Sequence, residues 1–279
     1  MTQIITDSAA DLPADIIDKY NIHVVPLTVN IDGKEYFDRV NLSAQEFYQK
    51  MATTKTLPKT SGPSVAAFIK AFSDLAAKGE LLCINISSGL SSTYQTACLA
   101  KEMSGVNVKI FDTWTTSLGQ GLHAIKAAML NEKGFSRTEI INKLTHYRNT
   151  MTNLVLLDTL ENVVKGGRLS KVQGSLAKLL NIKVLLTGDQ GKLVVQEKVH
   201  GKKKAFKILM EMINDGAQKA KNITTRLFSI THCNNIKDAE YLKNHIMDKY
   251  QPCEVIVNDM GPTIATYSGK GGLIISFLE

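Results

Sequence analysis

The sequence contains no hydrophobic run long enough to cross a membrane. A membrane-spanning helix needs about 20 apolar residues in succession, and no stretch of this 279-residue chain approaches that length. The opening residues, MTQIITD, also lack the basic start and the long apolar segment of a signal peptide. We therefore expect a cytoplasmic protein without a membrane span.

Cysteine and histidine are scarce, and their spacing does not suit a metal site. None of the four cysteines belongs to a CxxC pair, and none of the six histidines belongs to an HExxH motif. Cys83 and Cys253 lie in apolar, strand-like segments, which indicates packed free thiols. The sequence therefore predicts neither a disulfide framework nor a bound metal.

Motifs for nucleotide binding and for catalysis are also absent. No GxGxxG follows a predicted strand and no GxxxxGK[ST] occurs, so neither dinucleotide nor P-loop binding is supported. The segment 166–168 (GGR) is more typical of a tight turn with a surface or interdomain arginine than of a phosphate site. No GxSxG elbow is present, and Asp7, Asp11 and Asp112 are explained as capping residues. We expect no catalytic residues and no cofactor, and hence a protein that is not an enzyme.

Positive charge is in excess along the chain. The 33 Lys and Arg against 26 Asp and Glu give a net charge of +7, with one local cluster from Lys198 to Lys207. No zinc finger, RNP motif or aromatic-interleaved basic strand accompanies the cluster, so we do not expect nucleic-acid binding. Two interpretations of the cluster remain, a solvated helix start and a docking patch for an acidic protein partner.

The sequence does have a concentration of hydroxyl groups where a predicted strand leads into a helix. Residues 80–86 have the short apolar run of a buried strand, and residues 86–97 (ISSGLSSTYQTA) follow it with four serines. Ser92 and Gln95 fit a capping box that would start a helix at Thr93. Free N–H groups at a helix start favour an anion. Because the stretch has no Lys, Arg or His, it predicts a site for one carboxylate better than for a di- or triphosphate.

The alternation of strands and helices predicts an α/β fold. Strands at residues 2–6, 80–86 and 106–111 each precede a predicted helix, which is typical of a mostly parallel sheet with helices on its faces. Other expected features of the first half are one strand over 23–31 ending at an Asp32-Gly33 turn, a loop over 53–62, and capping boxes at Ser43/Glu46 and Ser136/Glu139.

The pattern changes near residue 150. The second half predicts a helix at 176–180 and strands over 154–158, 182–186, 192–199, 227–231, 253–257 and 272–277. We therefore expect two α/β domains. The N-terminal one, residues 1–150, has the mostly parallel sheet with flanking helices, and the C-terminal one, residues 151–279, is a smaller α/β domain.

Several short motifs, ordered along nearly the whole chain, resemble those of the DegV family. The members of this family are bacterial fatty-acid-binding proteins that present an acyl chain to a kinase. The matching segments are TDSAADLP (6–13), TSGPS (60–64), residues 86–97, Asp112 with SLGQG (117–121), KGGRL (165–169), His200-Gly201 and GPTI (261–264).

The resemblance implies two α/β domains that enclose a long-chain fatty acid, mainly within the N-terminal domain, while the C-terminal domain closes the carboxylate site. It implies that Thr60, Ser61 and Ser91 bind the carboxylate, although on sequence alone Thr60 and Ser61 could equally cap the following helix. Two positions depart from the family pattern. Ser92 replaces a glycine and adds a hydroxyl, and Tyr267 replaces a histidine and can donate a hydrogen bond without carrying charge.

The resemblance also implies a partner, a separate ATP-dependent fatty acid kinase. Arg168, Lys202 and Lys203 are the candidates for docking it. Lys270 stands where the family has a proline and could supply the missing histidine charge, although a solvated lysine is the simpler interpretation. The alternative from another class is a small-molecule phosphotransferase subunit or another lipid-related enzyme, which would need nucleotide or metal binding that the sequence does not show.

Overall fold

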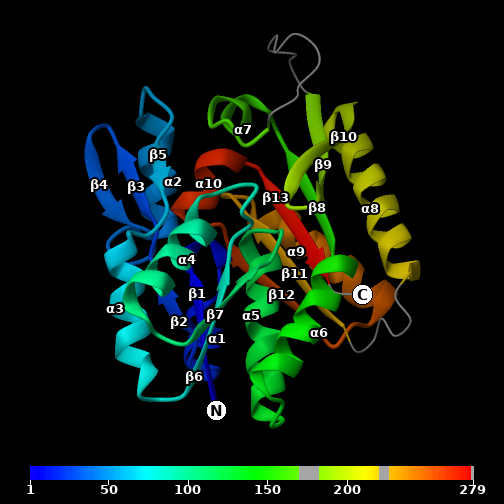
Figure 1. Ribbon diagram of the computed structural model, residues 1–279. Helices are drawn as coiled ribbons and strands as arrows, with labels where there is room; N and C mark the ends of the chain where they lie inside the picture. The colour runs from blue at the N-terminus through cyan, green and yellow to red at the C-terminus, as the bar shows by residue number, and fades with distance from the viewer. Residues whose placement is uncertain (170–181, 220–225, 278–279) are drawn as a thin grey trace.

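The computed structural model describes residues 1–169, 182–219 and 226–277, which form three β-sheets with helices around them (Figure 1). The first sheet has the strand order β2-β1-β6-β7, and all its neighbours pair in parallel. Its strands are β1 (Thr2–Asp7), β2 (His23–Val25), β6 (Glu80–Asn85) and β7 (Val108–Asp112). The predicted parallel sheet is confirmed.

Helices cover both faces of this sheet because its strands are apolar on both sides. Phe68 and Phe72 of α3 pack with Ile5 and Cys83 on one face, and Leu118 of α5 belongs to the core on the other face. The helices of this half are α1 (Ala14–Lys19), α2 (Ala44–Thr53), α3 (Val65–Ala76), α4 (Thr93–Ser104), α5 (Ser117–Glu132) and α6 (Arg137–Thr150).

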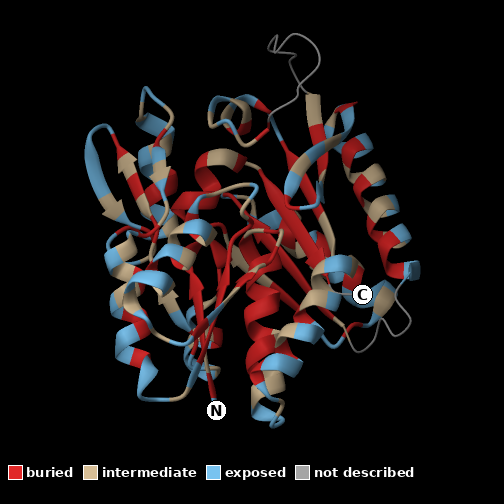
Figure 2. Cartoon of the chain, viewed as in Figure 1, coloured by how far each residue is buried: buried red, intermediate tan, exposed pale blue. Residues whose placement is uncertain are grey.

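The second sheet has six strands in the order β10-β9-β8-β13-β11-β12. It is mixed, since β11 and β12 pair in parallel and the other neighbours are antiparallel. Its strands are β8 (Thr152–Leu157), β9 (Ile182–Asp189), β10 (Lys192–His200), β11 (Leu227–His232), β12 (Glu254–Asp259) and β13 (Leu273–Phe277), and α8 (Lys202–Lys219) and α9 (Ile236–Tyr250) pack on one face. The other face packs against α5, which is therefore buried on most sides (Figure 2).

The third sheet is a small antiparallel one, β4-β3-β5, and it corrects two sequence predictions. The single strand expected over 23–31 is split into β2 and β3 (Thr28–Ile31), which belong to different sheets. Pro26 lies in the break, where its missing N–H cannot serve a ladder. The loop expected over 53–62 contains β5 (Lys59–Ser61), which pairs with β3, whereas the expected Asp32-Gly33 turn does join β3 to β4 (Lys34–Phe37).

Two of the three predicted capping boxes are present. Ser43 with Glu46 and Ser136 with Glu139 make both reciprocal hydrogen bonds. The box at Ser92 is wrong, because the Ser92 side chain makes no capping bond within the described structure. Its φ and ψ of −74° and 1° are not the extended conformation that aims a capping oxygen at the helix.

The chain is thus α/β, with a parallel sheet, flanking helices and a second sheet-containing domain, as the sequence predicts. We keep the division at residue 150, between α6 and β8, as a proposal; the helix expected at 176–180 lies outside the described residues. All four cysteines are free thiols, and Cys83 is buried as expected, but Cys253 is exposed just before β12. Among the described helices, none combines the length and the apolar character that a membrane crossing requires.

Candidate functional site

A pocket lies where the two large sheets and the small sheet meet. It contains about 640 Å³ of space free of atoms, including its open mouth. The elements that line it include β5, the loops after β6 and β7, strands β8, β10 and β13, and helices α7 (Glu161–Lys165) and α10 (Pro262–Ser268). The lining residues are Leu27, Thr60, Ile86, Leu90, Ser91, Thr116, Val155, Leu157, Val163, Arg168, Leu193, Thr263, Ile264, Tyr267, Ser268 and Ile274.

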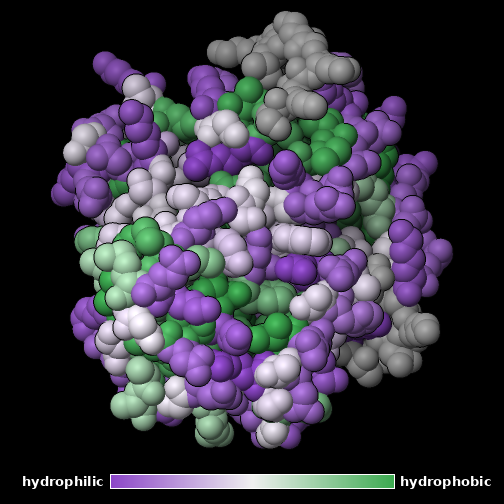
Figure 3. All heavy atoms as spheres, viewed as in Figure 1, coloured by the Kyte–Doolittle hydropathy of each residue, from purple (hydrophilic) through white to green (hydrophobic). Residues whose placement is uncertain are grey.

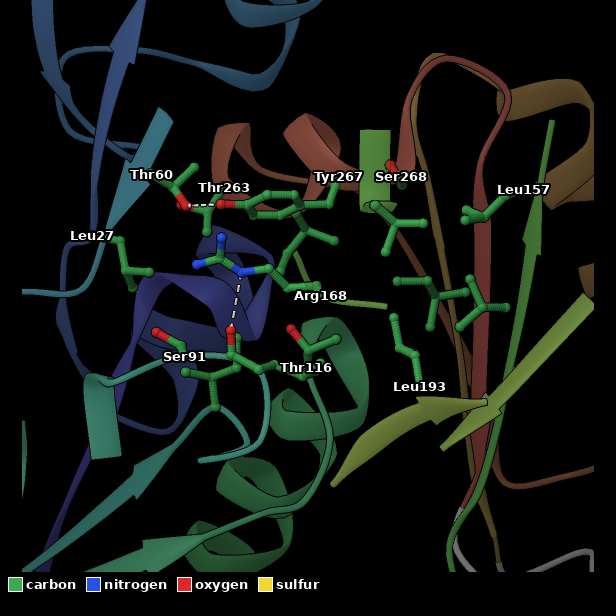
Figure 4. A pocket seen from close by; sticks show the side chains of 16 residues that line it. Leu27, Thr60, Ser91, Thr116, Leu157, Arg168, Leu193, Thr263, Tyr267 and Ser268 are labelled. Carbon is green, nitrogen blue, oxygen red and sulfur yellow. Dashed lines mark hydrogen bonds between the residues drawn. The ribbon is translucent and has the colours of Figure 1, made fainter. Parts of the chain in front are cut away.

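One end of the pocket is polar. There the hydroxyl of Tyr267 on α10 lies 2.5 Å from the hydroxyl of Thr60 on β5, a hydrogen bond between the two halves of the chain (Figure 4). Ser91 lies at the same end. Its hydroxyl is 2.9 Å from that of Thr93, and it accepts a bond from the Thr93 N–H at 3.3 Å. Three of the predicted carboxylate-binding residues therefore line one pocket.

The other two predicted residues, Ser61 and Ser92, do not belong to the described lining of this pocket. Both are exposed. A Cβ at Gly62 would lie only 2.8 Å from the Thr93 hydroxyl, so the glycine after Ser61 allows the end of β5 to approach the start of α4. The role of Ser61 in binding stays a prediction, and so does that of Ser92, although the described lining favours Ser91 over Ser92.

Arg168 lines the pocket and does not only lie on the protein surface. Its Nε donates to the carbonyl of Leu90 at 3.2 Å and its Nη1 to the carbonyl of Gly166 at 2.6 Å. Its guanidinium lies over the Tyr267 ring, 4.6 Å from the ring centre. A Cβ at Gly166 would clash with that ring, so this glycine is needed for the approach of Tyr267. The 166–168 turn thus brings a cation to the polar end.

The opposite end of the pocket is mostly apolar. Figure 4 shows Leu157 of β8 and Leu193 of β10 beyond Arg168, with Ser268 beside Leu157. Val155 of β8 and Ile274 of β13 also belong to the lining, so most of this apolar wall comes from the C-terminal half. A cavity with polar groups at one end and hydrocarbon at the other suits an amphipathic ligand.

Two threonines that the sequence did not single out also line the pocket, Thr116 and Thr263. The Oγ1 of Thr116 is buried without a hydrogen-bond partner among the described atoms, so it is ready to bond to a ligand. The hydroxyl of Thr263 is buried too, but it acts on the carboxyl of Asp38, whose pKa it lowers. Both threonines belong to recognisable segments of the sequence, the hydroxyl cluster before α5 and the segment 261–264. Neither pattern shows which side chain points into the pocket.

The rim of the pocket is a close contact between the halves. Ser87 donates from its hydroxyl to the carbonyl of Gly191, at 2.6 Å, in the turn between β9 and β10. A Cβ at Gly89 would lie 2.5 Å from that carbonyl oxygen, and a Cβ at Gly191 would lie 2.5 Å from the Ser87 hydroxyl. Only glycine at both positions lets the two backbones approach this closely.

Two acidic groups at the strand ends hold these loops in place. Of the three predicted caps, however, only Asp7 caps a described helix, the 3-10 turn Ser8–Ala10. The prediction is wrong for Asp112 and Asp11, which bond to loop groups and to other side chains. Asp112 accepts from the N–H groups of Ser88 and Trp114. Asp7 accepts from the N–H groups of Ala9 and Ile86; its complete burial raises the pKa of its carboxyl in spite of these bonds. Asp11 has different partners, which are described below.

The basic residues proposed for docking are separated in the structure. Lys202 begins α8 and pairs with Asp238 of α9 at 2.6 Å, and Lys203 is exposed beside it. Lys270 is exposed and lines a second, polar groove together with Lys183 and Lys202. No group of metal-binding residues occurs in the part of the chain that is described.

Comparison with known proteins agrees with this architecture. The family model described as "Uncharacterised protein, DegV family" matches residues 1–279. A DegV domain-containing protein of Clostridium acetobutylicum is 33% identical over 282 residues, covering 99% of this chain and 98% of that protein. A DegV family protein from Thermus thermophilus, described by its fatty acid binding, superposes with a TM-score of 0.92 at 28% identity, over 100% of this chain and 99% of that one.

A second solved structure carries a ligand. A DegV family protein from Eubacterium eligens, loaded with heptadecanoic acid, superposes with a TM-score of 0.85 at 25% identity and covers 99% of each chain. The match of the family model over the whole length, the identity to the clostridial protein and the shared fold agree. This chain belongs to the DegV family.

Proposed function

We propose that this protein binds a long-chain fatty acid in the pocket between its two halves. The observation that carries the proposal is the polarity of the pocket, with Thr60, Ser91 and Tyr267 at one end and an apolar wall at the other. The fatty acid binding of the Thermus protein and the heptadecanoic acid in the Eubacterium protein support the same assignment. The carboxylate would lie at the polar end.

Arg168 is our candidate for the charge that compensates the carboxylate. An unpaired buried carboxylate is unfavourable, and hydrogen bonds to a charged group contribute about 1.5–3 kcal/mol each. The Arg168 guanidinium stacks on the ring of Tyr267, and the hydroxyl of the same Tyr267 bonds to the hydroxyl of Thr60. Lys270 is a poorer candidate, because it lines the polar groove and not this pocket.

The acyl chain would lie against β8, β10 and β13. Each CH₂ group removed from water contributes about 0.8 kcal/mol, so ten buried groups would contribute roughly 8 kcal/mol before the cost of ordering the chain. Since the wall comes mainly from the C-terminal half, we propose that the chain lies between the halves. This differs from the location mainly within the N-terminal domain that the resemblance implied.

A protein purified without added lipid is expected to carry a fatty acid. Mass spectrometry of the denatured protein should find a long-chain acid in about equimolar amount, because the apolar wall would otherwise face water. Protein passed over a lipid-removing hydrophobic resin serves as the lipid-free control. Empty preparations that also fail to take up added palmitic or oleic acid would contradict the proposed function.

The proposal includes a partner, an ATP-dependent fatty acid kinase that phosphorylates the bound carboxylate, while this protein performs no chemistry itself. The N-terminus of α8 presents exposed lysines for such docking, and Figure 3 shows hydrophilic side chains over α8. Arg168 is less suited to a test of docking, since its substitution would also change the pocket. Stabilisation of this protein by ATP alone would instead favour the phosphotransferase alternative.

Charge reversal at Lys203 is expected to raise the concentration of this protein that gives half-maximal kinase activity by several fold. The reason is the loss of electrostatic attraction to an acidic partner surface. The matched control is Lys109→Glu, which makes the same charge change on an exposed residue of β7. Kinase assays titrated with each variant measure the effect; equal curves for the two variants would remove α8 from the docking surface.

A further inference from the structure

A cluster of charged groups, Asp11, Asp38 and Arg39, lies where the N-terminal half meets residues 259–263 of the C-terminal half. Asp11 and Asp38 are each only 1% exposed, and the Arg39 guanidinium lies beside them. Arg39 Nη2 contacts Asp11 Oδ1 at 3.3 Å. Arg39, whose side chain is 25% exposed, pairs with Asp11, and its charge also acts on the carboxyl of Asp38.

The cluster holds the segment that leads into α10. The Gly261 N–H donates to Asp11 Oδ1 at 2.7 Å, and the Thr263 N–H donates to Asp38 Oδ2 at 3.1 Å. Arg39 Nη2 also donates to the carbonyl of Asp259 at 2.6 Å. Each contact joins the N-terminal half to residues 259–263 of the C-terminal half.

The backbone of the cluster is unusual. Asp11 and Arg39 have φ values of 50° and 60°, in the left-handed region that non-glycine residues seldom adopt. Such conformations are unfavourable and persist where the surrounding contacts impose them. Both residues make the contacts to residues 259–261 described above, which is consistent with a functional position.

The two carboxyls cannot both be ionised without cost. A Cβ at Gly261 would lie within 3.0 Å of Arg39 Nε, Asp11 Oδ1 and Asp38 Oδ1, so these three atoms face one point. Within the described atoms, Asp38 Oδ1 and Arg39 Nε have no hydrogen-bond partner. Burial, together with the charge of Asp11, raises the pKa of Asp38 from its ordinary 3.8 to about 7, and burial also raises the pKa of Asp11.

The cluster is connected directly to the acyl pocket. Thr263, Ile264, Tyr267 and Ser268 of α10 all line that pocket. On its other side, the Asp38 N–H donates to the carbonyl of Leu27, a further lining residue, at 2.9 Å. A change in the ionisation of Asp38 can therefore shift both α10, through Thr263, and the backbone at Leu27, which lie on two walls of the pocket.

We propose that Asp11, Asp38 and Arg39 form a proton-sensitive clasp that positions α10 over the acyl pocket, so that ionisation of Asp38 speeds release of the bound acid. This inference rests on the proposed function. The three residues act as positioning residues, because they work through α10 and do not line the pocket themselves.

The direction of the pH dependence follows from linkage. In the closed form the pKa of Asp38 is about 7, and opening that exposes the carboxyl would return it toward 3.8. The closed form is then most stable when Asp38 is protonated, and opening becomes easier as the pH rises toward 7, by at most about tenfold per pH unit. Above that pH the release rate should level off.

Titration of the other groups near the clasp would give a different pH dependence of the release rate. Burial lowers the pKa of His232 below its ordinary value, so its protonation would loosen the interface at low pH, the opposite direction. Burial raises the pKa of Tyr48, and it raises that of Cys233 to about 12, so both stay neutral in the tested range. The groups that surround the clasp are Asp259, His232, Tyr48 and Cys233.

The test is the release rate of a bound fluorescent polyene fatty acid, parinaric acid, into excess serum albumin from about pH 5 to about pH 8.5. The parent protein should release it faster as the pH rises to about 7, with a plateau above. Asp38→Asn keeps an oxygen for the Thr263 N–H and cannot ionise, so its release should be slow and nearly independent of pH. The carboxyl of the ligand also titrates, so the release rate of the variant is compared with that of the parent at each pH. His232→Gln is the control and should keep the slope of the parent.

The same slope in Asp38→Asn as in the parent, or a flat parent profile, overturns the clasp. If Asp38→Asn does not fold, infrared difference spectroscopy of the parent complex tests whether Asp38 ionises near pH 7. The band of a protonated buried carboxyl should disappear between about pH 6 and about pH 8. Its absence would also overturn the inference. A protein that takes up no acid at any pH refutes the proposed function, whereas binding without this pH dependence refutes only the clasp.

Discussion

Substitution of Leu193 by arginine is expected to weaken the binding of palmitic acid by about 50- to 200-fold. Leu193 lies on the apolar wall and is only partly buried, so the larger side chain can enter the pocket without disrupting β10. An arginine there would displace three or four CH₂ groups of the ligand at about 0.8 kcal/mol each, and 1.4 kcal/mol corresponds to a factor of ten. Equilibrium displacement of a fluorescent fatty acid measures the change.

The control for this substitution is Val194→Arg. Val194 is the next residue of β10; it is 38% exposed and lies outside the described lining of the pocket. The two variants add the same charge to the same strand on opposite faces. Val194→Arg should bind like the parent, and equal losses in both variants would show that the acyl chain does not lie along β10.

Ser91→Ala is expected to weaken fatty acid binding by about ten- to a hundredfold while leaving the fold intact. The variant removes one hydroxyl donor from the carboxylate, a bond to a charged group that contributes about 1.5–3 kcal/mol. The internal partner of Ser91, the Thr93 hydroxyl, can rotate to another acceptor. Calorimetric titration with oleic acid measures the affinity, and circular dichroism checks the fold.

Ser92→Ala separates this effect from a general weakening of the strand-to-helix turn. Ser92 is the adjacent residue; it is exposed and caps nothing in the described structure. It should lose less than about threefold in affinity, because its hydroxyl lies away from the lining. A larger loss for Ser92→Ala than for Ser91→Ala would reverse the assignment of the two serines.

Much of the fold could be predicted from the sequence because it depends on local periodicity. The buried strand β6 and the amphipathic α3 both follow from apolar spacing. The three-residue β5 could not, since a strand this short exists only through its pairing with β3. Cys253 was misplaced for a related reason, because it lies one residue before its strand and outside the buried pattern.

The site was only partly predictable for the same physical reason. The resemblance named Thr60, Ser91 and Tyr267, and the structure brings these three to one pocket. The place of Arg168 depends on how two halves of the chain pack, with Gly166 leaving room for the Tyr267 ring. No local pattern in the sequence contains that information.

The glycine contact at the rim has a consequence for how this family can diversify. Gly89 and Gly191 leave no space for a side chain on either side of the rim contact. This contact, which we call the seam, therefore tolerates few substitutions. The wall beyond it consists of separate side chains on β8, β10 and β13, such as Leu157 and Leu193, each of which can be exchanged for a larger or smaller one. A protein built in this way can adapt to longer, shorter or branched acids by single substitutions, while the seam and the carboxylate end stay as they are.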